Sequence, residues 1–257
     1  LYPLSSHYYS CFGYIEHIPK DYLETGRHER FFKAKQESFK THSVIPSITK
    51  LSGDVNINSV IYIGLNNKLI IEAGSIISMQ KGGVLYIDGG SVEMRGTYEK
   101  PIIIKGNNKG SVFIKNSDNV ILSHVKVNSL TTCCGDNSWT TGSFTLYKSN
   151  AKLEYVDFLD HDIEDTLHVA ESKIYGNNIS FINSYSDGFD SDNSKVILIN
   201  VSAKNINGDG FDFFKSNATV ENFTLSNIFD KGFSVGENSN VHLNNGNITS
   251  ASVGFAS

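Results

Sequence analysis

Six side chains in the C-terminal half of this 257-residue chain have the types and the spacing to do chemistry. They recur at intervals of 22 residues and are Asp187, Asp190, Asp209, Asp212, Lys231 and His168. Two carboxylates about 5 Å apart suit a retaining glycosidase, and two carboxylates further apart suit an inverting one. Several carboxylate oxygens at one place also suit Ca²⁺.

Lys231 allows a second reaction scheme, an elimination that depends on calcium. The expected calcium ligands are Asp187, Asp190, Asp209 and Asp212. The bound ion would neutralise a uronic acid, and Lys231 would then remove the proton α to the carboxylate. The same residues therefore predict either hydrolysis or elimination, in both cases on an acidic polysaccharide.

Each candidate also has a purely structural interpretation. An aspartate at a turn commonly accepts hydrogen bonds from nearby backbone amides. Lys231 could simply pair with Asp209 one repeat away, and His168 could be a packed, hydrogen-bonded histidine. These alternatives stay open from the sequence alone.

The spacing of these residues comes from an internal repeat. Units of 22 residues begin at Ile163, Tyr185, Asn207 and Phe229, and a partial unit begins at Ala251. Each unit holds short alternating runs separated by Asn, Gly, Asp and Ser, without a helical period. Such a unit makes one turn of a parallel β-helix, which buries its apolar face only when turns stack.

The repeat predicts an all-β fold, a single-stranded right-handed parallel β-helix of about nine 22-residue turns over residues 46–257. Residues 1–45 lack the repeat and are predicted to form an N-terminal cap, because solenoid ends need protection from edge pairing.

Neighbouring turns of a β-helix lie about 4.8 Å apart. Stacked carboxylates at that distance repel, so at least one has a raised pKa or a cation lies between them.

Two columns of the repeat describe the predicted core and one corner. The first column is expected to be an inward stack and reads Leu167, Phe189, Phe211, Phe233 and Phe255. The position before it reads Thr166, Gly188, Gly210, Gly232 and Gly254. Recurring glycine predicts either a positive φ or a close approach of backbones. Asparagines of the repeat are expected to stack in corner ladders.

Residues 129–143 interrupt the spacing and predict a projecting loop beside the strands. Trp139, the only tryptophan, is expected either to stack on a sugar ring or to pack against protein. Cys133 and Cys134 are neighbours and Cys11 is the only other cysteine, so no disulfide framework is predicted.

Two stretches resemble known β-helix proteins. Residues 96–106, GTYEKPIIIKG, resemble a turn of right-handed parallel β-helices of the pectate-lyase-like superfamily. Residues 139–257 resemble the β-helix domain that accompanies bacterial spore-coat-kinase-like proteins, through motifs such as EDTLHVAES, SDGFDSDNS and GDGFDFFKS. The resemblance implies the fold.

A further resemblance concerns polygalacturonases. Their Asn-Thr-Asp-Gly-x-Asp turn, the Asp-Asp pair one turn later and the Gly-His-Gly of the turn after are similar to segments of this chain that begin at Ser186, Asn207 and Asp230. This sequence departs from the pattern at two places. Gly208 stands where the first aspartate of the pair would be, and Lys231 stands where the histidine would be.

These patterns predict a carbohydrate-active protein that cleaves or binds an acidic polysaccharide, outside the cell or at its surface. The alternative is a non-catalytic glycan-binding or spacer module attached to another domain. The net charge of −5 and the pI of about 5.9 argue against nucleic-acid binding. The sequence contains no apolar run of 18 residues, so no membrane-spanning helix is predicted. The aromatic column runs to the C-terminal edge, where a second copy or a neighbouring domain is expected.

Overall fold

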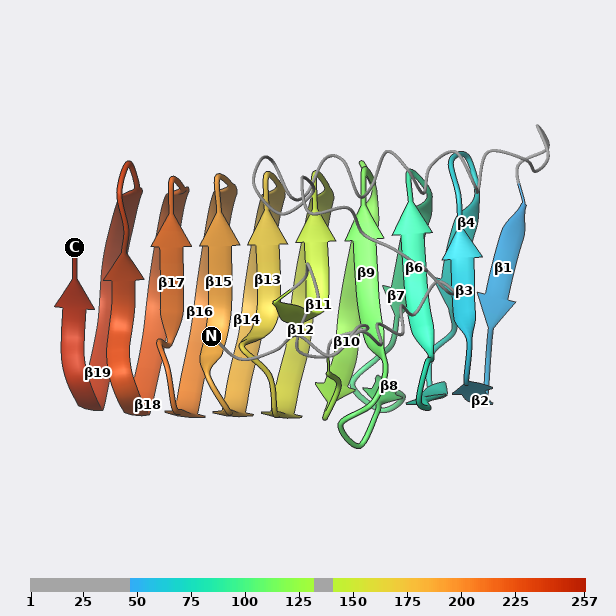
Figure 1. Cartoon of the computed structure of the whole chain (residues 1–257), viewed down its shortest axis with the longest axis horizontal. Helices are drawn as coiled ribbons and strands as arrows, with labels where there is room; N and C mark the ends of the chain where they lie inside the picture. The colour runs from blue at the N-terminus through green and yellow to red at the C-terminus, as the bar shows by residue number, and fades with distance from the viewer. Residues whose placement is uncertain (1–46, 132–140) are drawn as a thin grey trace, which may run out of the picture.

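The computed structural model describes residues 47–131 and 141–257, and within these ranges every regular element is a β-strand (Figure 1). The strands are β1 (Ile48–Leu51), β2 (Asp54–Ile57), β3 (Val60–Ile63), β4 (Lys68–Ile71), β5 (Ile76–Met79), β6 (Val84–Asp88), β7 (Ser91–Arg95), β8 (Ile102–Lys105), β9 (Ser111–Lys115), β10 (Val120–Asn128), β11 (Gly142–Tyr147), β12 (Asn150–His161), β13 (Asp165–Ala170), β14 (Lys173–Ser184), β15 (Asp187–Asp192), β16 (Lys195–Ile206), β17 (Phe211–Phe214), β18 (Asn217–Val235) and β19 (Asn240–Ala256). In these ranges there is no helix long and apolar enough to span a membrane.

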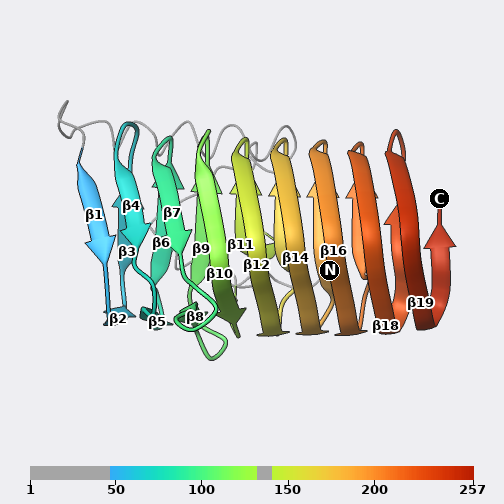
Figure 2. The same cartoon turned by 180° about the vertical axis from the view of Figure 1, so that it is seen from behind.

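All the strand pairs are parallel, and each strand pairs with the strand one turn later, which confirms the predicted parallel β-helix. The solenoid has about nine turns. Strands β9, β11, β13, β15 and β17 lie side by side on the face toward the viewer in Figure 1. Strands β10, β12, β14 and β16 lie on the opposite face, seen in front in Figure 2. The cap predicted for residues 1–45 lies outside the described residues.

The turn length is uniform only in the C-terminal half. Lys195 pairs with Asn217, a step of 22 residues. Near the N-terminus Ile48 pairs with Lys68, a step of only 20, and Val120 pairs with Ala151, a step of 31 that spans the predicted interruption at 129–143. The predicted step of 22 residues therefore does not hold in the first half, where one turn is shorter and loops between strands lengthen others.

The predicted aromatic stack fills the core. Phe189, Phe211 and Phe233 occupy the same position of successive turns and are fully buried. The ring centroids of Phe211 and Phe233 lie 5.2 Å apart in a stacked arrangement, a favourable geometry for aromatic pairs. Phe255 continues the column on β19, where it is 57% exposed.

The glycine column is explained by close backbone approach rather than by positive φ. A Cβ at Gly210 would lie 2.7 Å from the carbonyl oxygen of Gly232, and a Cβ at Gly188 would lie 2.9 Å from that of Gly210. None of these glycines has a positive φ. The stacking of turns therefore leaves no room for a side chain at Gly188 and Gly210.

Polar ladders run along two other corners. The predicted asparagine ladder is confirmed, because Asn178, Asn200 and Asn222 all have positive φ and the Asn222 amide donates to Asn200 Oδ1 at 3.1 Å. A serine ladder was not predicted. In it the backbone N–H of one serine donates to the hydroxyl oxygen of the serine one turn later, starting from Ser117, Ser149, Ser172, Ser194 and Ser216.

Candidate acid–base site on the acidic face

We call the face formed by β13, β15, β17 and the adjoining part of β18 the acidic face. Of the predicted carboxylates, Asp187 and Asp190 lie on β15, Asp212 lies on β17, and Asp209 lies just before β17 and is buried. Asp165 pairs with Asp187 in the register of β13 and β15. Asp209 follows Asp187 one turn later, and Lys231 follows Asp209. These four residues form the first column of the acidic face, as the 22-residue spacing predicts.

Aspartates of the first column cap the backbone of the next turn. The N–H of Asp209 donates to Asp187 Oδ1 at 2.8 Å, and the N–H of Lys231 donates to Asp209 Oδ1 at 2.9 Å. Lys231 Nζ also lies 3.1 Å from Asp209 Oδ1 and 2.6 Å from Asp230 Oδ2. The predicted pairing of Lys231 with Asp209 is therefore confirmed. The hydrogen bond to Asp230, together with the Asp209 contacts, raises the pKa of Lys231 despite some burial.

The second column of the acidic face has a different character. The strand register aligns His168, Asp190, Asp212 and Ser234 on successive turns. No hydrogen bond to an amide of the next turn is found for Asp190 in the described part of the chain. The second column therefore does not repeat the corner-capping pattern of the first.

His168 lies among three carboxyl groups. Its Nε2 is 3.5 Å from Asp190 Oδ2 and 3.4 Å from Asp192 Oδ2. Burial lowers the pKa of His168, but the hydrogen bond to Asp192 and the charges of Asp190 and Asp165 outweigh it, so the pKa is raised. His168 therefore favours its cationic form and partly balances the acids.

Burial raises the pKa of four aspartates of the acidic face, Asp165, Asp187, Asp190 and Asp212. Burial raises the pKa of Asp187 to about 7; the amide of Asp209 opposes this shift, and the charges of neighbouring aspartates add to it. Burial and the charge of Asp165 raise the pKa of Asp190 to about 8. Asp209, by contrast, is held in an ion pair with Lys231. Neighbouring carboxyl groups in such different environments are the usual mark of an acid and base pair.

The glycine at position 208, where the polygalacturonase pattern has an aspartate, has a geometric explanation. A Cβ at Gly208 would overlap Asp187 Oδ1 and lie 2.9 Å from Ser186 Oγ. An aspartate there could not coexist with the present position of the Asp187 carboxyl group. The Asp187 carboxyl group therefore excludes an aspartate at residue 208.

We expect Gly208→Ala to displace the Asp187 carboxyl group and break its hydrogen bond from Asp209. The Asp187 pKa should then move from about 7 toward its ordinary value, because the group gains solvent. Side-chain ¹³C NMR titration measures this shift. Gly236→Ala is the control, since a Cβ there comes no closer than 3.2 Å to its neighbours. An unmoved Asp187 titration in Gly208→Ala would contradict the steric argument.

The predicted calcium ligands fall into two groups. Carboxylate oxygens of Asp187, Asp209 and Asp212 lie within 4.8 Å of one another, whereas Asp190 groups with Asp165 and His168 instead. Three carboxylates fit the oxygen chemistry of Ca²⁺. However, both oxygens of Asp209 already contact the Lys231 ammonium, at 3.1 and 3.3 Å. A cation at the first group would therefore have to displace or share that ammonium.

Several site residues lie outside the prediction or outside the described chain. Asp165 and Asp192 contribute to the environment of His168 but were not predicted as site residues. Asp165 shares the 22-residue spacing, which could have revealed it; Asp192 does not follow His168 at that interval. Trp139, the predicted sugar-stacking residue, lies outside the described residues, as do Cys133 and Cys134.

Comparison with known proteins assigns no family. No protein-family model matches this chain, and no curated protein matches it significantly. The fold and the acidic face therefore define a parallel β-helix protein with two columns of titratable groups on one outer surface. The relation to the pectate-lyase-like superfamily and to spore-coat-kinase-like proteins stays a prediction.

Proposed function

We propose that this protein cleaves an acidic polysaccharide by acid–base catalysis on the acidic face. The observation that carries the proposal is the contrast between Asp187, whose pKa is raised to about 7, and Asp209, which is ion-paired with Lys231. A neutral carboxyl group beside an ionised one is the arrangement that glycosidic bond hydrolysis requires. The fold is compatible with carbohydrate-active proteins.

In the proposed reaction Asp187 donates its proton to the glycosidic oxygen of the departing sugar. Asp209, with Asp212 beside it, provides the carboxylate that stabilises positive charge on the sugar or activates the attacking water. Single oxygens of these three residues all lie within 4.8 Å of one another, so the carboxyl groups are near neighbours, as the short separation in retaining enzymes requires. Asp190 lies on β15 with Asp187, and His168 lies one turn earlier, on β13.

The charge of the acidic face is compatible with an anionic substrate. Asp187 and Asp190 hold protons near neutral pH, because burial raises the pKa of each. Lys231 and His168 add positive charge. The acidic face therefore repels a uronate chain less than its number of aspartates indicates.

An acidic polysaccharide substrate places the protein outside the cell or at its surface. We also propose β19 as the edge where a second copy or a neighbouring domain docks.

Cleavage should disappear as the pH rises through about 7. Asp187 can donate a proton only while it is protonated, which holds below its pKa of about 7. The test is the rate of release of reducing ends from polygalacturonate between pH 5 and pH 9. A rate that rises across this range would contradict the assignment of Asp187 as the acid.

Folding stability should also fall as the pH rises from 6.5 to 8. A carboxyl group with a pKa raised in the folded state binds its proton more tightly when folded, so ionisation destabilises the fold. His161, whose pKa burial lowers to about 4, has the opposite effect, but only below pH 6.5. Urea denaturation across this window measures the slope, and Asp187→Asn should make it shallower, while the raised pKa values of Asp190 and His168 maintain the remainder. An unchanged slope in that variant would show that Asp187 is not the titrating group.

A calcium-dependent lyase is the second candidate, favoured by the group of Asp187, Asp209 and Asp212. In that scheme Ca²⁺ would neutralise the uronate and Lys231 would remove the α proton. The raised pKa of Lys231 and its two carboxylate contacts weigh against it as a base. Lysine must lose its own proton before it can accept one.

One assay separates the candidate functions. Acidic and neutral polysaccharides are incubated with the full chain, with and without Ca²⁺, and bound polysaccharide, new reducing ends and unsaturated uronate are all measured. Reducing ends without unsaturation support hydrolysis, whereas unsaturated product that requires Ca²⁺ supports the lyase. Binding without cleavage would favour the glycan-binding module, and neither binding nor cleavage would favour the spacer.

A further inference from the structure

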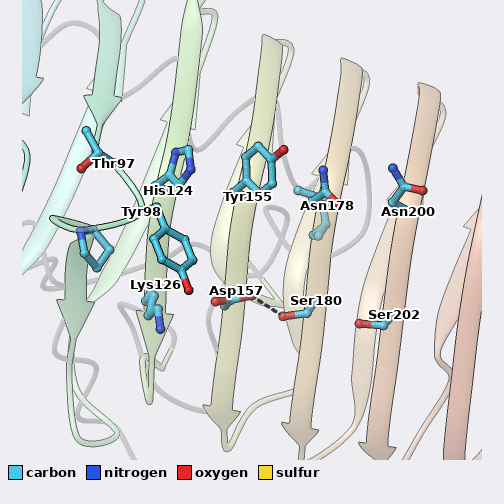
Figure 3. A pocket seen from close by; sticks show the side chains of 12 residues that line it. Thr97, Tyr98, His124, Lys126, Tyr155, Asp157, Asn178, Ser180, Asn200 and Ser202 are labelled. Atoms are coloured by element: carbon cyan, nitrogen blue, oxygen red, sulfur yellow. Dashed lines mark hydrogen bonds between the residues drawn. The ribbon is translucent and has the colours of Figure 1, made fainter.

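A pocket of about 390 Å³ lies away from the acidic face, against the strands that Figure 2 shows in front. It is formed by β10, β12, β14 and β16 together with the loop between β7 and β8. Figure 3 shows the rings of Tyr98, His124 and Tyr155 at one end, and Asn178, Asn200, Ser180 and Ser202 along the other. Its volume falls in the usual range for small-molecule sites, about 300–1,000 Å³.

The aromatic end interrupts a regular corner of the solenoid. The corner carries one positive-φ residue per turn, and in the C-terminal turns that residue is asparagine, as at Asn178, Asn200 and Asn222. In the two preceding turns the same position holds His124, with a φ of 50°, and Tyr155, with a φ of 56°. Asparagine tolerates positive φ far better than a bulky residue does. The packing of the solenoid does not explain why His124 and Tyr155 replace asparagine, because asparagine occupies the same corner position in later turns.

The rings at this corner form an exposed platform. His124 and Tyr155 stack with centroids 4.6 Å apart and ring planes at 18°. Tyr155 is 52% exposed, and Tyr98 on the neighbouring loop is 87% exposed. Strained backbone that keeps aromatic rings on the surface is typical of a ligand-binding position.

The loop that carries Tyr98 is held in place. The N–H of Gly96 donates to the carbonyl of Ser123 at 2.8 Å, and Lys100 and Thr97 bond each other through their backbones. A Cβ at Gly96 would lie only 2.5 Å from the carbonyl oxygen of His124. The loop therefore lies directly against the corner, so the aromatic end of the pocket is formed in advance of any ligand.

Polar groups line the rest of the pocket. Lys126 is exposed and makes no ion pair with any residue in the described ranges. Asp157, beside it in the strand register, accepts a hydrogen bond from Ser180 Oγ at 2.6 Å. Donors and acceptors thus alternate along the pocket, next to the apolar faces of the rings.

We propose that this pocket is a saccharide-binding site, separate from the acidic face, that holds a pyranose ring of a glycan. The C–H face of a pyranose packs on aromatic rings, and its hydroxyl edge needs both donors and acceptors. Tyr98 and Tyr155 provide the faces, and Asn178, Asp157 and Lys126 provide the polar partners. The proposal stands on this geometry alone and does not require catalysis on the acidic face.

The test measures binding to the full chain carrying Asp187→Asn, which suppresses cleavage. Isothermal titration uses galacturonate oligomers and cello-oligosaccharides, and ¹H NMR follows the ring resonances of His124. We expect Tyr98→Ala and Tyr155→Asn each to weaken binding about tenfold, the loss typical of a central aromatic contact. Tyr155→Asn restores the asparagine found at this corner in later turns, so the variant should fold.

The controls distinguish the site and the kind of sugar. Tyr175→Ala removes a half-exposed ring of the same face that does not line the pocket, and it should bind like the parent. Weaker binding of galacturonate alone in Lys126→Met identifies an acidic ring, and equal binding of both sugar series in that variant identifies a neutral one. The proposal is overturned if neither series shifts the His124 resonances, or if Tyr98→Ala and Tyr155→Asn bind as tightly as the parent.

Discussion

Asp187→Asn should lower the rate of polysaccharide cleavage by about 10²- to 10⁴-fold, the range that general acid catalysis contributes. The substitution removes the proton that we assign to the leaving sugar. It preserves the fold, because the asparagine Oδ1 can still accept the N–H of Asp209, which Asp187 now accepts at 2.8 Å. Initial rates on polygalacturonate at pH 6 measure the effect.

Two further variants separate catalysis from structure. Asp54→Asn removes an exposed carboxylate of β2, far along the chain from the acidic face, and should leave the rate unchanged. Asp187→Ala loses both the proton and the hydrogen-bond acceptor, so it should lose stability as well as activity. If Asp187→Asn cleaves at the parental rate, Asp187 is only a corner cap.

Phe211→Ala should lower the free energy of unfolding by about 3–5 kcal/mol, the usual cost of truncating a buried phenylalanine. The Phe211 ring is fully buried and contacts the rings of Phe181, Phe189 and Phe233 in three turns. The neighbouring turns cannot move together to fill the space, because backbone hydrogen bonds keep them at a constant separation. Guanidinium denaturation monitored by circular dichroism measures the loss.

The matched control lies on the same strand. Phe214 is also on β17, but its side chain is 40% exposed, so Phe214→Ala removes an equal volume from the surface. We expect that variant to lose less than about 1 kcal/mol, as surface substitutions usually do. Similar losses in the two variants would mean that the aromatic column does not dominate the stability of these turns.

The fold could be predicted from sequence where successive turns have equal length. With a constant step of 22 residues, Phe189, Phe211 and Phe233 had to share one column, and so did Asp187 and Asp209. Parallel strands then turn a spacing in sequence into neighbours in space. The same logic failed before β12, where a step such as that from Val120 to Ala151 breaks the period.

The alignment of the candidate acids in columns was predictable, but the environment of each acid was not. The columns of acids followed from spacing. That Asp187 is buried enough to hold a proton, and that Asp209 is held by Lys231, depends on solvent exposure and side-chain direction. The absence of an aspartate at Gly208 looked like a lost catalytic group, whereas the structure shows a steric exclusion by Asp187.

The aromatic pocket could not be predicted from the repeat. Tyr98 is on a loop, and Tyr155 occupies a corner that is an asparagine in the regular turns, so neither belongs to a recurring pattern. A search for departures from the corner asparagine could have found His124 and Tyr155. The register of unequal turns, which only the structure supplies, was needed to bring Tyr98 to them.

The ladders of serine and asparagine have a consequence for how this protein can change in length. Each turn offers the next the same bonding groups, so removal of residues 195–216 would bring Asn217 to the place of Lys195, its present register partner. The molecule would shorten by about 4.8 Å and lose Asp209 and Asp212, yet every ladder would close again. A deletion that removes only part of a turn would set unlike groups against each other. Gain and loss of whole turns is therefore an evolutionary route by which such a scaffold can acquire or discard a reactive surface without having to refold around it.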